Sequence, residues 1–141
     1  MSGEARNFLS ATLKNHLSEI GKVLKEFEDF AQQRRIPGEA IQKVKVTFDE
    51  LLSNSVSYGF PDGGEHEIEV VVEWAGGYLR ITITDGGIPF NPFQQEPPQL
   101  GWSLEEAPVG GIGIHLVRDL MDEVFYRRVG DRNVVTLVVN W

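Results

Sequence analysis

The hydrophobic period of this chain changes near Gly59, and this change constrains the fold more than any other feature of the sequence. Before it, apolar residues recur at the three- and four-residue spacings that are typical of a helix. After it, apolar and polar residues alternate, as they do on strands with one buried face. Helices that are segregated from hairpins in this way predict an α+β fold and not a doubly wound sheet.

The same periods predict the individual elements. Residues 8–13 could form an opening edge strand, and Ser18 is a candidate N-cap for a first helix that ends near Arg35. A second helix is expected to open at Pro37 and to stop at Gly59. Further along the chain we expect a hairpin over 67–84, an aperiodic loop over 88–109, a helix after residue 113 and a last hairpin over 123–139. A proline-rich loop of this length inside a compact domain is commonly a lid or a binding loop.

Size and composition exclude several classes of protein. The 141 residues predict a single domain, residues 1–141, and the absence of Cys rules out disulfides and thiolate metal sites. The net charge of -8 argues against binding to nucleic acid, whose phosphates require a cationic surface. No apolar run approaches the roughly 18 residues that span a bilayer, and the N-terminus lacks a signal-peptide pattern. The cytoplasm, with no membrane partner, is therefore the expected location.

Two polar side chains stand out on the second predicted helix. Glu50 and Asn54 are four residues apart, so they lie one above the other on the same face, beside an apolar stripe. A carboxylate and a carboxamide at the edge of a buried face could hold a hydrated metal and a polarised water. Taken alone, such a pair is more often a solvated helix face.

Two further polar features mark the ends of buried elements. Asp85 follows a core strand and precedes two glycines, where an Asp is most often a turn residue but could accept a hydrogen bond from an exocyclic amine. Gly110, Gly111 and Gly113 open a helix, where free backbone N–H groups suit phosphate. That glycine pattern is weak by itself, since a tight turn into a helix explains it equally well. The joint occurrence of the three features favours a pocket between helices and sheet.

As an ordered set, these features resemble the sequence boxes of the GHKL (Bergerat-type) ATPases. The residues 50–54, ELLSN, look like the N box, and the residues 85–92, DGGIPFNP, look like the G1 box. The residues 110–124, GGIGIHLVRDLMDEV, look like the G2 box. The amino-acid sequence of these segments most resembles that of the anti-sigma-factor serine/threonine kinases. The resemblance implies a two-layer α/β sandwich with a mixed, mostly antiparallel sheet and helices on one face.

The resemblance also implies a role for each site residue. Asn54 would coordinate Mg²⁺ on the phosphates of ATP, and Glu50 would be the catalytic base toward the attacking hydroxyl. Asp85 would bind the adenine amino group, and Gly87 would allow a close approach of the backbone. Thr136, in the closing strand, would support Asp85 through water. The three glycines Gly110, Gly111 and Gly113 would flank the phosphates and hinge the lid.

The implied function is that of an ATP-dependent kinase that phosphorylates a Ser or Thr of an anti-sigma-factor antagonist of the STAS type. Such a kinase also sequesters a sigma factor, and the family typically works as homodimers. The predicted lid contains no Lys or Arg, and Arg118 lies a turn or two inside the helix that follows it. A module that senses nucleotide without phosphotransfer therefore stays open as an alternative. The catalytic domain of a histidine kinase is less favoured, since no phospho-accepting helical hairpin is expected before Glu50.

Overall fold

The secondary structure follows the predicted order closely. The structure, a computed structural model, describes residues 7–94 and 111–141, and for residues 111–114 it describes the backbone alone. The prediction that Ser18 is an N-cap is wrong, because Ser18 lies inside a short 3-10 turn. Helix α1 starts after Glu19 without a side-chain cap. The elements are β1 (Phe8–Lys14), η2 (Leu17–Glu19), α1 (Ile20–Gln33), α2 (Gly38–Tyr58), β2 (Glu67–Ala75), β3 (Tyr78–Asp85), η3 (Pro92–Gln94), α3 (Gly111–Leu120), β4 (Glu123–Val129) and β5 (Arg132–Asn140).

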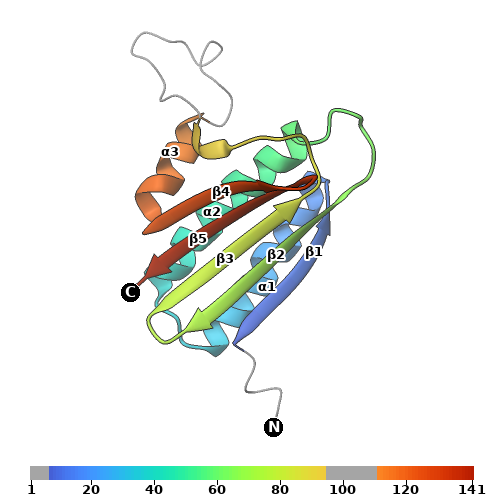
Figure 1. The fold of residues 1–141 in the computed structure, drawn as a ribbon. Helices are drawn as coiled ribbons and strands as arrows, with labels where there is room; N and C mark the ends of the chain where they lie inside the picture. The colour runs from blue at the N-terminus through green and yellow to red at the C-terminus, as the bar shows by residue number, and fades with distance from the viewer. Residues whose placement is uncertain (1–6, 95–110) are drawn as a thin grey trace.

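The strands form one five-stranded sheet in the order β1-β2-β3-β5-β4 (Figure 1). All four neighbouring pairs of described strands are antiparallel, where a mixed, mostly antiparallel sheet was expected. Two-residue turns at Gly76-Gly77 and Gly130-Asp131 close the two hairpins. Gly77 and Gly130 have φ angles of 101° and 61° there, which glycine adopts without steric cost. The register sets Asp85 on β3 directly opposite Asn133 on β5.

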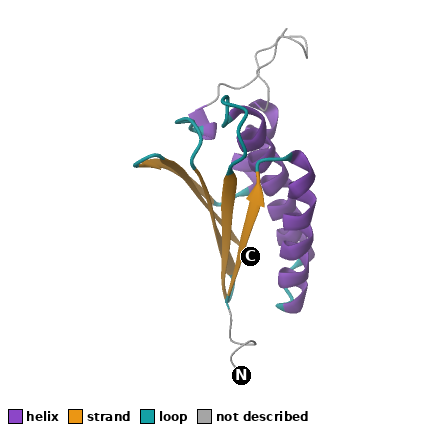
Figure 2. Ribbon diagram, turned by 90° about the vertical axis from the view of Figure 1, so that its right-hand side faces the viewer, coloured by secondary structure: helices purple, strands orange, loops and turns teal. Residues whose placement is uncertain are grey.

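The helices cover one face of the sheet and leave the other face open (Figure 2). Alternate strand residues point toward the helices, which is why Leu79, Ile81 and Ile83 on β3 are buried. The apolar stripe of α2 packs in the same layer, and the Phe27 and Phe48 rings meet edge to face with centroids 5.6 Å apart. The core therefore lies between sheet and helices, as an α+β sandwich requires. None of the helices in the described part of the chain is long and apolar enough to cross a membrane.

The turn after α1 contains a strained residue. Arg35 has a φ of 55°, and it is the one non-glycine residue with positive φ within residues 7–94 and 115–141. The backbone bonds Ile36 N–H to Ala31 O (3.1 Å) and Arg35 N–H to Gln32 O (3.1 Å) end the helix in a Schellman motif. Glycine is the usual residue at this left-handed position, because any Cβ is crowded there.

We therefore expect Arg35→Gly to stabilise the fold by about 0.5–1 kcal/mol, since the relief of left-handed strain exceeds the added chain entropy of glycine. A melting experiment should show a rise of roughly 2–4 °C for a domain of this size. Arg35→Ala is the matched control, because it removes the exposed guanidinium and keeps the Cβ. An equal rise in both variants would assign the effect to charge and contradict the backbone explanation.

Candidate functional site

A pocket opens where α2 ends beside the last residues of β3 and the first of β5. The residues 85–92, which leave β3, form its third wall. The carboxamide of Asn54 and the carboxylate of Asp85, both predicted from the sequence, face the same cavity although they come from different layers. The lining residues are Leu51, Asn54, Ser55, Gly59, Ile83, Asp85, Phe90, Pro92, Asn133 and Val135. The pocket is therefore apolar on most sides, with a few polar groups that converge.

Asn54 is held in this pocket by the burial of the apolar face of α2. The residue is 8% exposed, and no hydrogen bond to its carboxamide is found within residues 7–94 and 115–141. A buried amide usually has a partner, so this one is available to a ligand. Its oxygen is the kind of donor that Mg²⁺ accepts, and no group of three or more acidic or His side chains elsewhere in those residues could hold a metal. One amide oxygen fits a Mg²⁺ ion that would take its other ligands from a bound molecule and from water.

Glu50 lies one turn before Asn54 on the same face of α2 and is half-buried, outside the residues that line the cavity. Burial raises the pKa of the Glu50 carboxyl above its ordinary value, and the neighbouring Asp49 carboxylate adds to the rise. A carboxylate with a raised pKa is a better proton acceptor near neutral pH. The position and the pKa are both those of a candidate general base.

Asp85 is 6% exposed and is held by three hydrogen bonds. Its Oδ1 accepts from the Gly87 N–H (2.9 Å) and from Asn133 Nδ2 (3.0 Å), and its Oδ2 accepts from the Ser55 hydroxyl (3.2 Å). Two carboxylate oxygens offer about four acceptor sites. One site on Oδ2 remains for a donor from a ligand, which suits the predicted role toward an exocyclic amine.

Gly87 lies against the end of α2. A Cβ at this position would stand 2.5 Å from the Gly59 carbonyl oxygen, and the next residue, Ile88, donates its N–H to that same oxygen at 2.9 Å. The predicted close approach of the backbone at Gly87 is therefore made to Gly59. Any contact with a nucleotide stays a prediction.

Gly87→Ala is expected to destabilise the fold by about 1–3 kcal/mol, because two backbone segments must separate to admit a methyl group. It should also weaken ligand binding, since both segments line or border the pocket. Gly86→Ala is the matched control, because a Cβ there would meet only the Asp131 carbonyl oxygen at 3.9 Å, an ordinary contact. Denaturant unfolding of the two variants measures the difference, and similar midpoints would contradict this explanation.

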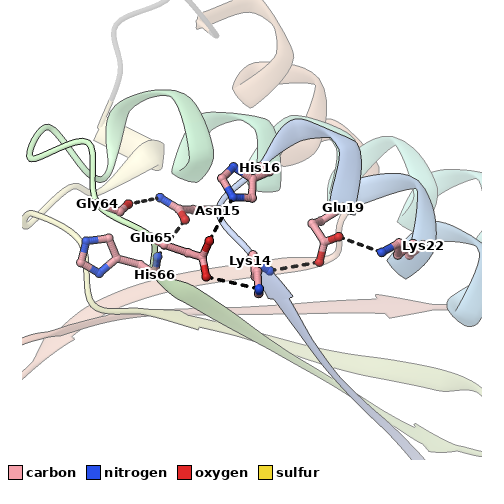
Figure 3. A network of polar contacts seen from close by, with 8 residues as sticks. All are labelled: Lys14, Asn15, His16, Glu19, Lys22, Gly64, Glu65 and His66. Atoms are coloured by element: carbon pink, nitrogen blue, oxygen red, sulfur yellow. Dashed lines mark hydrogen bonds and ion pairs between the residues drawn. The ribbon is translucent and has the colours of Figure 1, made fainter.

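The connection between α2 and β2, which starts at Gly59, is fastened to the end of β1 (Figure 3). Asn15 donates from Nδ2 to the Gly64 carbonyl (3.0 Å) and accepts from the His66 N–H at Oδ1 (2.8 Å). Lys14 and then His16 contact Glu65, and these contacts lower the pKa of its carboxyl. This network fixes the far end of the connection, whose first residue, Gly59, lines the pocket.

The prediction that Thr136 supports Asp85 is wrong. Side chains alternate along β5, and Thr136 is three residues from Asn133, so the two side chains point to opposite faces of the sheet. Thr136 lines a shallow groove on the open face, together with Arg80 and Phe125. Asn133 occupies the supporting position instead. One signal in the sequence could have found it, since it is the one polar residue in the inward alternation of Asn133, Val135, Leu137 and Val139.

The predicted lid is described only at its beginning. Residues 95–110 lie outside the described residues, and with them Trp102, Gly110 and most of the predicted lid over 88–109. Gly111 and Gly113 lie in the first turn of α3, as predicted. Arg118 does not face the pocket with a free cation, because it donates to the Phe93 carbonyl oxygen and its guanidinium lies 5.6 Å from the Phe93 ring centroid. Arg118 therefore fastens η3 to α3.

Comparison with known proteins agrees with this geometry. A family model described as a histidine kinase-like ATPase domain matches residues 12–139. The chain belongs to this family. The three segments that resemble the N, G1 and G2 boxes supply Asn54, Asp85 and the first turn of α3.

Two curated relatives are protein kinases. The chain is 34% identical over 89 residues to the serine/threonine-protein kinase BtrW of Bordetella bronchiseptica, a match that covers 63% of each chain. It is 33% identical over 109 residues to the serine-protein kinase RsbW of Listeria monocytogenes, covering 72% of this chain and 68% of the relative. The matches thus span about two thirds of the length of these relatives.

A solved structure has the same fold. The structure of the RsbU and RsbW domains of Rv1364c from Mycobacterium tuberculosis aligns with a TM-score of 0.68 at 16% identity. The alignment covers 96% of this chain and 32% of that one.

Proposed function

We propose that this ATPase-family domain is a Mg-ATP-dependent protein serine/threonine kinase and anti-sigma regulator. The proposal rests mainly on Glu50. Its carboxyl is half-buried and has a raised pKa, and it lies one helical turn before Asn54, which lines the pocket. A domain that only bound nucleotide would have no use for such a base. The identity of 33–34% to proteins named as serine-protein or serine/threonine-protein kinases supports the same reading.

The proposed chemistry assigns one task to each residue. Asp85 binds the amino group of adenine, and the Asn54 oxygen would hold a Mg²⁺ ion, which would supply neutralisation of phosphate charge. The hydroxyl oxygen of the acceptor Ser or Thr forms a bond to the γ-phosphorus, and the bond between that phosphorus and the bridging oxygen to the β-phosphate breaks. Glu50 takes the hydroxyl proton. Such transfer depends on positioning and charge neutralisation more than on covalent catalysis.

The proposed partners are an anti-sigma-factor antagonist of the STAS type, as phosphoacceptor, and a sigma factor, as the protein that is sequestered. The net charge of -8 suits a basic surface on one of them. The proposed assembly is a homodimer. Because ATP and sigma factors are cytoplasmic, the proposal also places the protein there.

Incubation of the chain with Mg-ATP and candidate antagonist domains tests the proposal, with phosphoserine or phosphothreonine read by mass spectrometry. We expect a gain of one phosphate on a single antagonist residue, and no gain with Asn54→Ala. Calorimetry with Mg-ATP runs in parallel. Binding without transfer to any candidate would favour the nucleotide-sensing alternative, and absence of binding would overturn both functions.

A further inference from the structure

Asn133 is the hub of a buried polar network behind Asp85. Its side chain, on a residue that is 5% exposed, uses all of its hydrogen-bonding groups. Nδ2 donates to Asp85 Oδ1 (3.0 Å) and to the Ile88 carbonyl (2.8 Å). The three donors around Oδ1 are Tyr126 Oη (2.6 Å), Arg128 Nη1 (3.2 Å) and the Phe90 N–H (3.3 Å).

This arrangement permits one orientation of the amide. A flip of Asn133 would set its NH₂ against the N–H donors of Arg128 and Phe90 and its oxygen against two acceptors, so four of the five contacts would be lost, and the Tyr126 hydroxyl, which can also accept, could keep the fifth. The N–H donors of Arg128 and Phe90 and the two acceptors therefore determine that Asn133 donates to Asp85, and the Tyr126 hydroxyl adds a short hydrogen bond to the amide oxygen in that orientation. A buried network in which every member is satisfied is rigid, because any single rotation leaves several groups without partners.

The network also fixes the segment that follows Asp85. Arg128 Nη1 donates to the Gly87 carbonyl at 2.7 Å, and Asn133 holds Ile88 and Phe90 by their backbones. Phe90 lines the pocket. Tyr126 and Arg128 come from the edge strand β4, so residues on the edge strand help to position Asp85 on β3, two strands away.

We propose that Asn133, whose amide oxygen is held in place by Tyr126 and Arg128, is a positioning residue that makes the pocket selective for a 6-aminopurine. With Oδ1 of Asp85 held by Asn133 and Gly87, the remaining acceptor site on Oδ2 has a fixed direction. An acceptor in a fixed direction binds the amine of adenine and repels the keto oxygen that hypoxanthine carries at the same carbon. The inference rests on the proposed function, since it presumes that the pocket takes a purine nucleotide.

The test compares the affinities of Mg-ATP and Mg-ITP, measured by calorimetry, for the parent chain and for Tyr126→Phe. The parent should prefer ATP. Tyr126→Phe should lower this preference about two- to tenfold, which is the usual contribution of one hydrogen bond to an affinity. The change should come from weaker ATP binding, with little change in the affinity for ITP. Tyr78→Phe is the matched control, because it deletes a hydroxyl from the open face of the sheet and should keep the parent preference.

Melting curves of the parent and of Tyr126→Phe show whether the variant is folded when its affinities are measured. Equal losses of ATP and ITP affinity in Tyr126→Phe would indicate a structural role alone and overturn the inference, as would an unchanged preference. Arg128→Lys keeps the charge and loses the fixed fork, so it provides a second variant with the same expected drop should Tyr126→Phe fail to fold. A parent chain that binds neither nucleotide would overturn the proposed function, whereas a parent preference that both variants retain would overturn this inference alone.

Discussion

Glu50→Gln should lower the rate of phosphotransfer about 10²- to 10⁴-fold, the usual contribution of a general base. Mg-ATP affinity should stay within about twofold of the parent, because Glu50 lies outside the lining of the pocket while Asn54 and Asp85 are retained. Single-turnover assays with the antagonist and calorimetry with Mg-ATP measure the two quantities. Equal rates in mutant and parent would remove Glu50 from the role of base.

The same substitution should stabilise the fold at neutral pH. Burial raises the Glu50 pKa in the folded state above the ordinary value of 4.5, so folding disfavours the ionised form. The contribution of a carboxyl with a raised pKa is fully present below its ordinary pKa and is lost as the pH rises through the folded-state pKa. Relative to the parent, Glu50→Gln should therefore melt higher at pH 7–8, and this advantage should disappear by about pH 4.

Asp49→Asn is the matched control for the phosphotransfer readout. It removes the same charge from the adjacent, exposed position, and it should keep phosphotransfer near the parent rate. A loss of activity in Asp49→Asn equal to that in Glu50→Gln would indicate a general electrostatic effect at this part of α2. A lower melting temperature for Glu50→Gln at neutral pH would contradict the pKa argument.

Asp85→Asn should weaken Mg-ATP binding by about 1–3 kcal/mol, because an amide NH₂ would replace an acceptor that faces the ligand amine. The hydrogen bonds between residue 85 and its protein partners should survive this substitution. The Asn oxygen can still accept from Gly87 and Asn133, while its NH₂ can donate to the Ser55 hydroxyl, which accepts as well as donates.

The nucleotide preference provides the internal control for this variant. The new NH₂ group would face the keto oxygen of ITP favourably, so ITP affinity should rise or hold while ATP affinity falls. Calorimetry with both nucleotides on parent and variant measures the change. Parallel losses for ATP and ITP would mean that the substitution damages the pocket generally and would count against base recognition by Asp85.

Most elements were predictable because each has a strong local signal. The alternation over residues 67–84 and 123–139 fixed both hairpins, and the two-residue turns hold the glycines that such turns require. The start of α1 was predicted less well. Ser18 has the chemistry of an N-cap, but Leu17–Glu19 forms a 3-10 turn, so Ser18 lies inside that turn and not at the start of α1.

Some residues of the candidate site were likewise predictable from the sequence, and others were not. Asn54 and Asp85 were found from motifs, and the pocket joins them. Thr136 was assigned from the resemblance, as a residue of the closing strand, and it fails because the register between β3 and β5 turns its side chain to the open face. A shift of one residue in register exchanges the two faces of a strand, so a role for a strand residue depends on a pairing that sequence alone did not give.

The sequence by itself determined the α+β class, the order of helices and hairpins, and the polar residues that end α2 and β3, because periodicity and turn chemistry are local properties. Tertiary structure decided which groups hold those residues. Asn133, Tyr126 and Arg128 converge behind Asp85 only because β5 inserts between β3 and β4 in the sheet. Strand order brings together residues that are 48 positions apart in the chain, and no local pattern encodes that distance.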